Sequence, residues 1–163
     1  MARVKRASPQ AIRAATARDA SLIADLVRRA FAAQPRPTNP PSSALEETAA
    51  TIAAHLARGG GAVLEREDVV AGAVLWEEED GALYISRVSV DPEYRRQGIA
   101  RALMDEAERE ARRQGFSRMT LGVRLELVEN HQLFRSCGFV DAELRSHEGF
   151  SRPTWVLMER RLT

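Results

Sequence analysis

The stretch LYISRVSVDPEYRRQGIARALMDEAEREARRQG, residues 83–115, decides the fold, because it joins a strand, a glycine-bearing turn and a helix. Apolar residues fall at odd positions up to Ile85 and at even positions from Val88 onward. Successive side chains of a strand point to opposite faces, so this change of phase across Ser86-Arg87 predicts a β-bulge. Bulges recur beside active sites and also at ordinary sheet edges, so the bulge alone leaves both interpretations open.

The segment RRQGIA, residues 95–100, connects this strand to the helix. The apolar residues of the helix recur every four positions, at Ile99, Leu103, Ala107 and Ala111. The first turn of a helix offers unpaired N–H groups at the positive end of the macrodipole, and Gly98 lets a ligand approach the backbone. The segment therefore predicts an anion site, with a plain turn carrying solvated arginines as the alternative. Gly115 is expected to end the helix.

The composition is that of an ordinary globular protein. The chain has 163 residues, of which 44% are hydrophobic and 29% charged, with a formal net charge of +1. This length suits one hydrophobic core, so we expect a flexible N-terminus over residues 1–10 and a single domain over residues 11–163. The near-zero net charge gives no reason to expect nucleic acid or a membrane as partner.

Cysteine usage and the N-terminal sequence predict a cytoplasmic location. The single cysteine, Cys137, is expected to be a buried filler residue, because it has no second cysteine for a disulfide or a zinc motif. We expect no bound metal. The N-terminal MARVKRASPQ is basic but is not followed by an apolar run, so we expect neither a signal peptide nor a membrane span.

The N-terminal third is expected to hold a strand and two helices. A strand is predicted over residues 11–15, and the pair Thr16 and Asp19 forms a capping-box signature before the first helix. A second such pair, Ser43 and Glu46, predicts a helix over residues 43–58. The apolar positions of the two helices are Leu22, Ile23, Leu26, Val27, Ala30 and Phe31, then Leu45, Ala49, Ile52, Ala53 and Leu56. The proline-rich residues 34–43 between them are expected to be a loop.

The remainder alternates in a way that predicts a mixed sheet. Strands are expected at residues 62–66, 69–78, 83–90, 119–125, 139–145 and 154–161, with a short helix at 128–136. The first three of these strands form an antiparallel meander, because only short turns separate them. A helical crossover then makes the strand at 119–125 parallel to the strand at 83–90.

A series of motifs along the chain resembles the GNAT superfamily of acyl-CoA-dependent N-acetyltransferases. Arg95-x-x-Gly98-x-Ala100 follows Val88-Ser89-Val90-Asp91-Pro92, and Asn130 and Leu133-Phe134-x-x-x-Gly138-Phe139 lie downstream. The resemblance covers nearly the whole chain, and its specificity lies in the order of the elements. It implies an α+β (mixed α/β) fold: a mostly antiparallel sheet of about seven strands with a bulged, splayed fourth strand, and about four helices.

The resemblance implies that acetyl-CoA is the co-substrate and that a primary amine attacks it directly. The CoA diphosphate would bind the backbone amides of residues 96–101, and the Val88 amide would donate to the thioester carbonyl as an oxyanion donor. The cofactor-binding residues it implies are Val88, Ser89, Val90, Arg95, Arg96, Gln97, Gly98, Ile99, Ala100, Arg101, Asn130 and Phe134.

The proton-transfer groups are not decided by the resemblance. Many members carry a tyrosine as general acid where this chain has Phe134, which has no ionisable group. His147 is a candidate general base, with a plain hydrogen-bonding role in its loop as the alternative. Further candidates near the strand ends are Tyr84, Ser86, Glu126 and Glu129. The base is therefore left unassigned.

Two interpretations of function remain from the sequence. The leading one is an N-acetyltransferase acting on a small molecule or peptide, and the other is a non-catalytic acyl-CoA-binding or regulatory domain of the same fold. A nucleotide-hydrolysing P-loop is excluded because no Gly-Lys-Ser/Thr follows Gly98. The acceptor amine stays open, as does the choice between a monomer and a homodimer that pairs through an exposed final strand.

Overall fold

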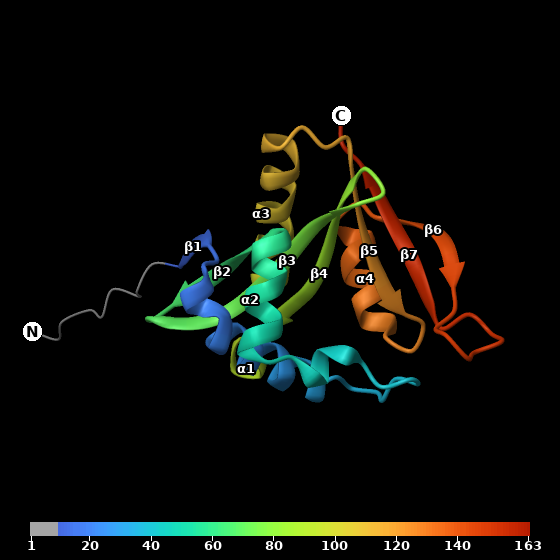
Figure 1. The fold of residues 1–163 in the computed structure, drawn as a ribbon, viewed down its shortest axis with the longest axis horizontal. Coiled ribbons are helices and arrows are strands. Elements are labelled where there is room, and N and C mark those ends of the chain that lie inside the picture. Colours follow the sequence, from blue (N-terminus) through green and yellow to red (C-terminus); the bar gives the residue numbers. More distant parts are fainter. Residues whose placement is uncertain (1–9) are drawn as a thin grey trace, which may run out of the picture.

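The structure, a computed structural model, describes residues 10–163. Residues 1–9 of the segment 1–10 that was expected to be flexible lie outside the described residues. Seven strands form one sheet in the order β1-β2-β3-β4-β5-β7-β6, with helices on both faces (Figure 1). The strands are β1 (Ala11–Ala14), β2 (Gly60–Arg66), β3 (Val69–Glu79), β4 (Ala82–Val90), β5 (Arg118–Arg124), β6 (Val140–Arg145) and β7 (Trp155–Arg161). The helices are α1 (Ala20–Ala32), α2 (Ala49–Arg58), α3 (Ile99–Arg113) and α4 (Val128–Ser136), with short 3-10 turns η1 (Ala17–Asp19), η2 (Ser43–Glu46) and η3 (Pro92–Tyr94).

The sheet is antiparallel except between β4 and β5, which run parallel as the helical crossover predicts. This confirms the predicted α+β fold with its mostly antiparallel sheet. Strand β7 lies between β5 and β6, so the expectation of an exposed final strand is wrong, and β6 forms that edge of the sheet. A chain that returns through a hairpin can place its last strand inside the sheet, and the order of strands in space is not visible in local pattern. None of the described helices is long and apolar enough to cross a bilayer.

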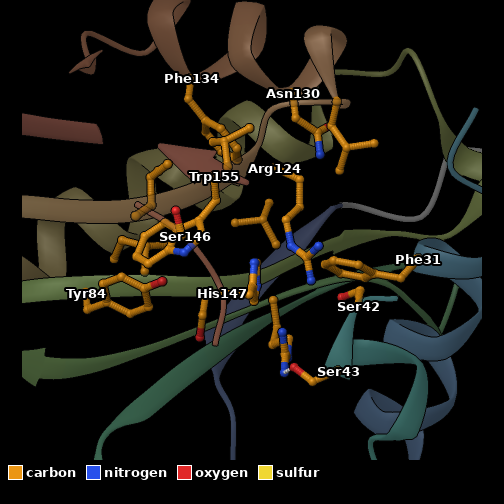
Figure 2. A pocket seen from close by; sticks show the side chains of 18 residues that line it. Phe31, Ser42, Ser43, Tyr84, Arg124, Asn130, Phe134, Ser146, His147 and Trp155 are labelled. Atoms are coloured by element: carbon orange, nitrogen blue, oxygen red, sulfur yellow. Dashed lines mark hydrogen bonds between the residues drawn. The ribbon is translucent and has the colours of Figure 1, made fainter. Parts of the chain in front are cut away.

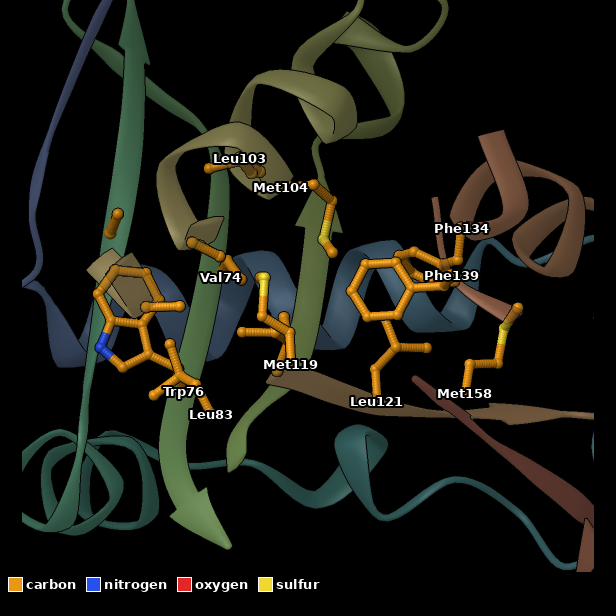
Figure 3. Packing of buried hydrophobic residues seen from close by; sticks show 14 of the residues in the cluster. Val74, Trp76, Leu83, Leu103, Met104, Met119, Leu121, Phe134, Phe139 and Met158 are labelled. Atoms are coloured by element: carbon orange, nitrogen blue, oxygen red, sulfur yellow. The ribbon is translucent and has the colours of Figure 1, made fainter. Parts of the chain in front are cut away.

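Two hydrophobic clusters cover the two faces of the sheet. On one face, α3 packs on the sheet together with Phe134 of α4 (Figure 3). On the other face, α1, η2 and α2 pack against residues of β2 and β3. Strand β3 supplies both clusters, because Val74 belongs to the first and Leu75 to the second. Alternating side chains of one strand thus hold the two layers together.

Helix α3 buries the face predicted for it. Its four-residue repeat Ile99, Leu103, Ala107 and Ala111 is at most 1% exposed. Gly72 on β3 lies under this face, where an added Cβ would come within 2.7 Å of Ile99 Cγ2. The glycine therefore lets the helix lie close to the sheet, which sets the position of the turn that precedes α3.

The bulge predicted at Ser86-Arg87 is present. Leu75 of β3 pairs with Ser86 and Ala73 pairs with Ser89, so two residues of β4, Arg87 and Val88, stand opposite one of β3. Arg87 has a φ of +53°, a left-handed conformation that costs a non-glycine residue stability. On the other side of β4, pairing with β5 ends at Ile85. The two strands therefore splay apart at the bulge, as expected for the fourth strand.

The first capping box is present and is reinforced by an ion pair. The Thr16 amide donates to Asp19 Oδ2 at 2.8 Å, and the Arg13 guanidinium donates to both Asp19 oxygens at 2.8 Å. The Arg13 contact is the main reason that the pKa of Asp19 falls to about 2, and it outweighs the effect of burial. This buried carboxylate joins the end of β1 to the start of α1.

The predicted helix over residues 43–58 is wrong at its start. Residues 43–46 form the 3-10 turn η2, and α2 begins only at Ala49, where Thr48 caps it by accepting from the Thr51 amide at 3.2 Å. Glu47 has an extended backbone between the two (φ −61°, ψ 138°), which a capping-box pattern read alone does not reveal. Leu45 therefore does not belong to the α2 face and is 40% exposed.

Three other burial predictions also differ from the structure. Leu22 is 56% exposed, and Phe31 of the same predicted face is only half-buried. Ala49, expected to face inward, is exposed at the start of α2. Cys137 is half-buried, so it is only partly the buried filler residue that was expected. Periodicity alone does not distinguish the core from its edge.

Candidate functional site

The splay between β4 and β5 opens a groove made of two pockets. We name the one beside residues 95–101 the turn pocket, of about 670 Å³, and the one between the splayed strand ends the wedge pocket, of about 370 Å³. Four residues line both pockets: Phe31, Val88, Asn130 and Phe134. The two pockets are therefore parts of one continuous groove.

The turn pocket is built mainly from backbone. Within residues 10–163, no backbone or side-chain acceptor takes a hydrogen bond from the amides of residues 96–101. Gly98 has a φ of +76°, and an added Cβ there would have no neighbour within 4 Å. A side chain at this position would thus project into open space beside the free amides. The turn can bind an anion such as a diphosphate.

The three arginines around the turn have different roles. Arg95 lines the pocket, but its guanidinium donates to the carbonyls of Ala30 and Ala33 at the end of α1, both at 3.4 Å. Arg101 donates to Ser136 Oγ at 2.7 Å and so connects α3 to α4. The guanidinium of Arg96 has no partner among the described side chains. Arg96 is the arginine left to meet an anion.

The structure brings most of the predicted cofactor residues to the groove and leaves two outside its walls. Residues lining the turn pocket are Val88, Val90, Arg95, Arg96, Gly98, Ile99, Ala100, Arg101, Asn130 and Phe134. Ser89 is 1% exposed and donates to the Arg87 carbonyl at 3.0 Å, so its hydroxyl faces away. Gln97 lines neither pocket. The Ser89 hydroxyl is therefore directed away from the groove, and the exposed Gln97 side chain lies outside its walls.

Val88 stands at the junction of the pockets. It has no pairing partner on β3 or on β5, because the bulge and the splay coincide there. Val88 lines both pockets, so its backbone, which pairs with neither neighbouring strand, lies where ligands bound in the two pockets would meet. A backbone N–H at such a junction is suited to stabilise negative charge that develops on an oxygen.

The wedge pocket is built from side chains of distant segments (Figure 2). Its polar and aromatic lining residues are Phe31, Ser42, Ser43, Tyr84, Ser86, Arg87, Arg124, Asn130, Ser146, His147 and Trp155. Arg87 reaches from the bulge to Glu47 at 3.1 Å and to Ser43 at 2.9 Å. The strained bulge residue thereby fastens the η2 segment over the pocket.

His147 lies in the wall of the wedge pocket as a candidate base should. Its backbone amide donates to Thr154 Oγ1 at 2.9 Å, and its Nδ1 also contacts that hydroxyl. Its ring lies 6.4 Å from those of Phe150 and Trp155. Burial and then the positive charge of Arg124 lower the pKa of His147 below its ordinary value. The imidazole is therefore neutral at pH 7, with Nε2 free of partners among the described residues.

The other candidate bases separate into two pairs. Tyr84 and Ser86 line the wedge pocket, and burial raises the pKa of Tyr84, so its hydroxyl stays protonated at neutral pH. Glu126 instead accepts from the Asn39 amide at 2.8 Å, and Glu129 pairs with Arg36 at 2.9 Å. These two carboxylates hold the proline-rich loop and do not line the wedge pocket.

Several residues of the wedge pocket carried no recognised signal in the sequence. Arg87, Arg124, Phe31 and Trp155 come from four different elements, and no spacing relates them. The one available signal was the change of phase at Ser86-Arg87, which marks Arg87 as a residue that the bulge re-aims. Arg124 ends a strand that otherwise reads as ordinary alternation.

Comparisons with known proteins agree with this geometry. The family model described as the acetyltransferase (GNAT) family matches residues 23–139. An N-acetylaspartate synthetase from Xenopus tropicalis is 34% identical over 99 residues, which is 61% of this chain and 36% of that protein. The chain thus spans about a third of the length of that relative.

Solved structures share the fold. The ribosomal-protein-S18-alanine N-acetyltransferase from Escherichia coli superposes with a TM-score of 0.76 at 22% identity, covering 94% of each chain. The PaiA N-acetyltransferase from Thermoplasma acidophilum, solved in complex with coenzyme A, superposes with a TM-score of 0.78 at 15% identity. The comparison covers 95% of this chain and 100% of that one. At these identities the likeness is one of fold.

Proposed function

The chain belongs to the acetyltransferase (GNAT) family, and we propose that it transfers the acetyl group of acetyl-CoA to a primary amine by direct attack. The observation that carries this proposal is the continuity of the groove. Free turn amides, unpaired bulge backbone and a side-chain pocket follow one another along it. This order matches a co-substrate whose diphosphate, amide-bearing arm and thioester also follow one another.

The residues present fit CoA. The amides of residues 96–101 with the open space at Gly98 would hold the diphosphate, and Arg96 adds a free positive charge. The backbone of Val88 and Val90 would pair with the amides of the pantetheine arm. The Asn130 side chain, which has no hydrogen-bond partner among residues 10–163 and lines both pockets, would contact the same arm.

The reaction needs four changes of bonding. The amine nitrogen attacks the thioester carbon, and the carbonyl oxygen takes the negative charge under the Val88 N–H. The carbonyl then re-forms, the C–S bond breaks, and the sulfur leaves with the electron pair. His147 Nε2 accepts the proton that the amine loses, directly or through water. Because Phe134 replaces the tyrosine acid, the thiolate takes its proton from solvent.

The location and assembly form part of the proposal. We place the reaction in the cytoplasm, on the strength of the lone Cys137. Acetyl-CoA and an amine are the partners, and the protein acts as a monomer or a homodimer without a metal. The names of the relatives include acetylation of a protein alanine and synthesis of N-acetylaspartate. They support an amine acceptor and leave its identity open.

Two measurements on the purified protein test the proposal. Calorimetry should show CoA binding at micromolar or tighter affinity, and a thiol reagent should report CoA release from acetyl-CoA in the presence of an amine panel. Absence of CoA binding would contradict the proposal. CoA binding without amine-dependent thiol release would instead identify the non-catalytic acyl-CoA-binding domain.

A further inference from the structure

Arg124 is a half-buried arginine at the end of β5, and its side chain points into the wedge pocket toward His147 and Phe31 (Figure 2). It donates one hydrogen bond, to the Pro40 carbonyl at 2.6 Å. No carboxylate pairs with it among residues 10–163. A guanidinium has five N–H donors, so most of its donors remain free in the pocket.

Arg124 and the bulge lie on the two strands that splay apart. Ile85 and Leu121 are the last pair of β4 and β5, and beyond them Val88 of β4 and Arg124 of β5 both line the wedge pocket. Arg124 lies on the same face of β5 as Gly122, where an added Cβ would come within 3.0 Å of the Tyr84 hydroxyl. The free guanidinium thus faces the space in which the amine must approach Val88.

The charges around the pocket leave Arg124 uncompensated. Arg87, the other arginine of the wedge pocket, already has Glu47 as its partner. Glu126 lies two residues from Arg124, but its carboxylate accepts from the Asn39 amide. Burial lowers the pKa of Arg124, with Glu126 opposing this effect and Arg87 adding to it. The guanidinium remains charged at pH 7, and an anion in the pocket would remove this electrostatic cost.

We propose that Arg124 binds a carboxylate of the acceptor, so that the substrate is a small amino acid, a molecule with both a primary amine and a carboxylate. This inference rests on the proposed acetyl transfer. Guanidinium and carboxylate form paired hydrogen bonds of fixed geometry, and the contact to Pro40 already holds one side of the fork. Binding the carboxylate at β5 directs the amine toward the bulge of β4 and the ring of His147.

The size of the pocket agrees with this substrate class. At about 370 Å³ the wedge pocket is small for a ligand site, and Phe31, Ser42 and Ser43 close it on one side. The serine hydroxyls supply neutral hydrogen bonds for the remainder of the molecule. The pocket therefore favours a compact polar amine over a long apolar one.

Binding to the CoA-saturated protein tests the inference independently of turnover. The probes are the N-acetyl derivatives of the common L-amino acids and of β-alanine, each compared with its carboxamide by calorimetry. In the unmodified protein, at least one acid should bind about 10- to 100-fold tighter than its amide, as charge-assisted hydrogen bonds require. The same free amino acids and amides are then assayed for CoA thiol release.

Three variants separate the role of Arg124 from general effects. Arg124→Gln should abolish the preference for acids, and Arg124→Lys should restore part of it because charge returns without the planar fork. Arg118→Gln removes an arginine at the opposite end of the same strand, where it pairs with Glu159, and should keep the full preference. CoA affinity should be the same in all three variants.

The possible outcomes distinguish this inference from the proposed function. Equal binding of acids and amides, or an Arg124→Gln variant that weakens both alike, overturns the role of Arg124. Thiol release with neutral amines alone overturns the inference and leaves acetyl transfer standing. Acids that bind through Arg124 without any thiol release support the carboxylate site and contradict acetyl transfer. If no probe binds and no amine is acetylated, both are contradicted.

Discussion

The turn pocket and the wedge pocket lie in one groove but are built on different principles. The turn pocket offers mainly backbone amides from one contiguous segment, residues 95–101. The wedge pocket offers side chains from α1, η2, β4, β5, α4, β7 and the loop before β7. Backbone groups are present whatever the residue type, so the first pocket depends on local conformation. The second depends on which side chains the fold brings together.

The largest effect is expected in the turn pocket, at Gly98. Gly98→Val should weaken CoA binding about 1,000-fold, because a β-branched residue is strained at a φ of +76° and its side chain occupies the space beside the free amides. Calorimetry with CoA measures the loss. Gly115→Val is the matched control: Gly115 also has a positive φ, +82°, and open space, but lies at the other end of α3. Equal loss of CoA affinity in both variants would contradict the diphosphate site.

A substitution in the wedge pocket should lower the reaction rate and leave CoA affinity unchanged. His147→Ala should lower kcat for the best amine about 100-fold, the lower range for a general base, while CoA binds as before. The lowered pKa of His147 means that the neutral base persists below the ordinary imidazole value of about 6.5 and is lost only as pH falls further.

The pH profile decides whether this loss reflects proton transfer. The acid limb of kcat/KM should lie below pH 6.5 and should be weakened or absent in His147→Ala. His131→Gln is the control, because that histidine pairs with Asp141 at 2.9 Å and lies outside the wedge pocket. An unchanged rate in His147→Ala would leave His147 as a residue that only orders its loop.

Phe31, at the end of α1, lines both pockets. Loss of the Asp19 carboxylate at the start of α1 should therefore lower the stability of the fold and should not act on one pocket alone. Asp19→Asn should lower the free energy of unfolding by about 2 kcal/mol at pH 7. The pKa of Asp19 is about 2, below its usual value, so its contribution is complete above about pH 4 and is lost as pH falls toward 2.

Denaturation at several pH values measures this contribution. The gap between the unmodified protein and Asp19→Asn should close near pH 2, where the native carboxylate takes up its proton. Asp105→Asn makes the same change of charge at an exposed position of α3 and should have little effect. A gap that stays constant with pH would show that the ion pair with Arg13 does not stabilise the fold.

The smallest effect is expected at Asn130, where the two pockets meet. Asn130→Ala should weaken CoA binding about fivefold, since it removes about one neutral hydrogen bond. The measurement is again calorimetry, with Gln132→Ala, also on α4, as the comparison. No change in affinity would show that the pantetheine arm does not bind the Asn130 side chain.

Much of the fold follows from patterns within short segments. The four-residue repeat of α3, the short turns of the meander and the phase change at Ser86-Arg87 each predicted the observed element, because each depends on neighbours in sequence. The split between η2 and α2 was missed because the Ser43 and Glu46 pattern precedes the Thr48 cap by only a few residues, and Thr48 with Thr51 does not match the capping-box sequence. Only packing decides which one begins the long helix.

The candidate site divides in the same way. The glycine-bearing turn before α3 could be predicted because Gly98 and the first turn of α3 determine it locally. The presence of Arg124 and Val88 in one pocket could not, because the two residues are far apart in the chain and come to the wedge pocket only through the folding of β4 beside β5. The engagement of Glu126 and Glu129 by the proline-rich loop likewise depends on contacts across the chain.

By itself, the sequence determined the order of the elements, the bulge and the glycine-bearing turn before α3, since hydrogen-bonding and steric rules of neighbouring residues suffice for these. The tertiary structure alone decided which side chains surround the acceptor. Charge compensation between distant segments, with Glu47 pairing Arg87 and no carboxylate in the described chain pairing Arg124, exists only after folding. That difference between two arginines carries the inference about the substrate.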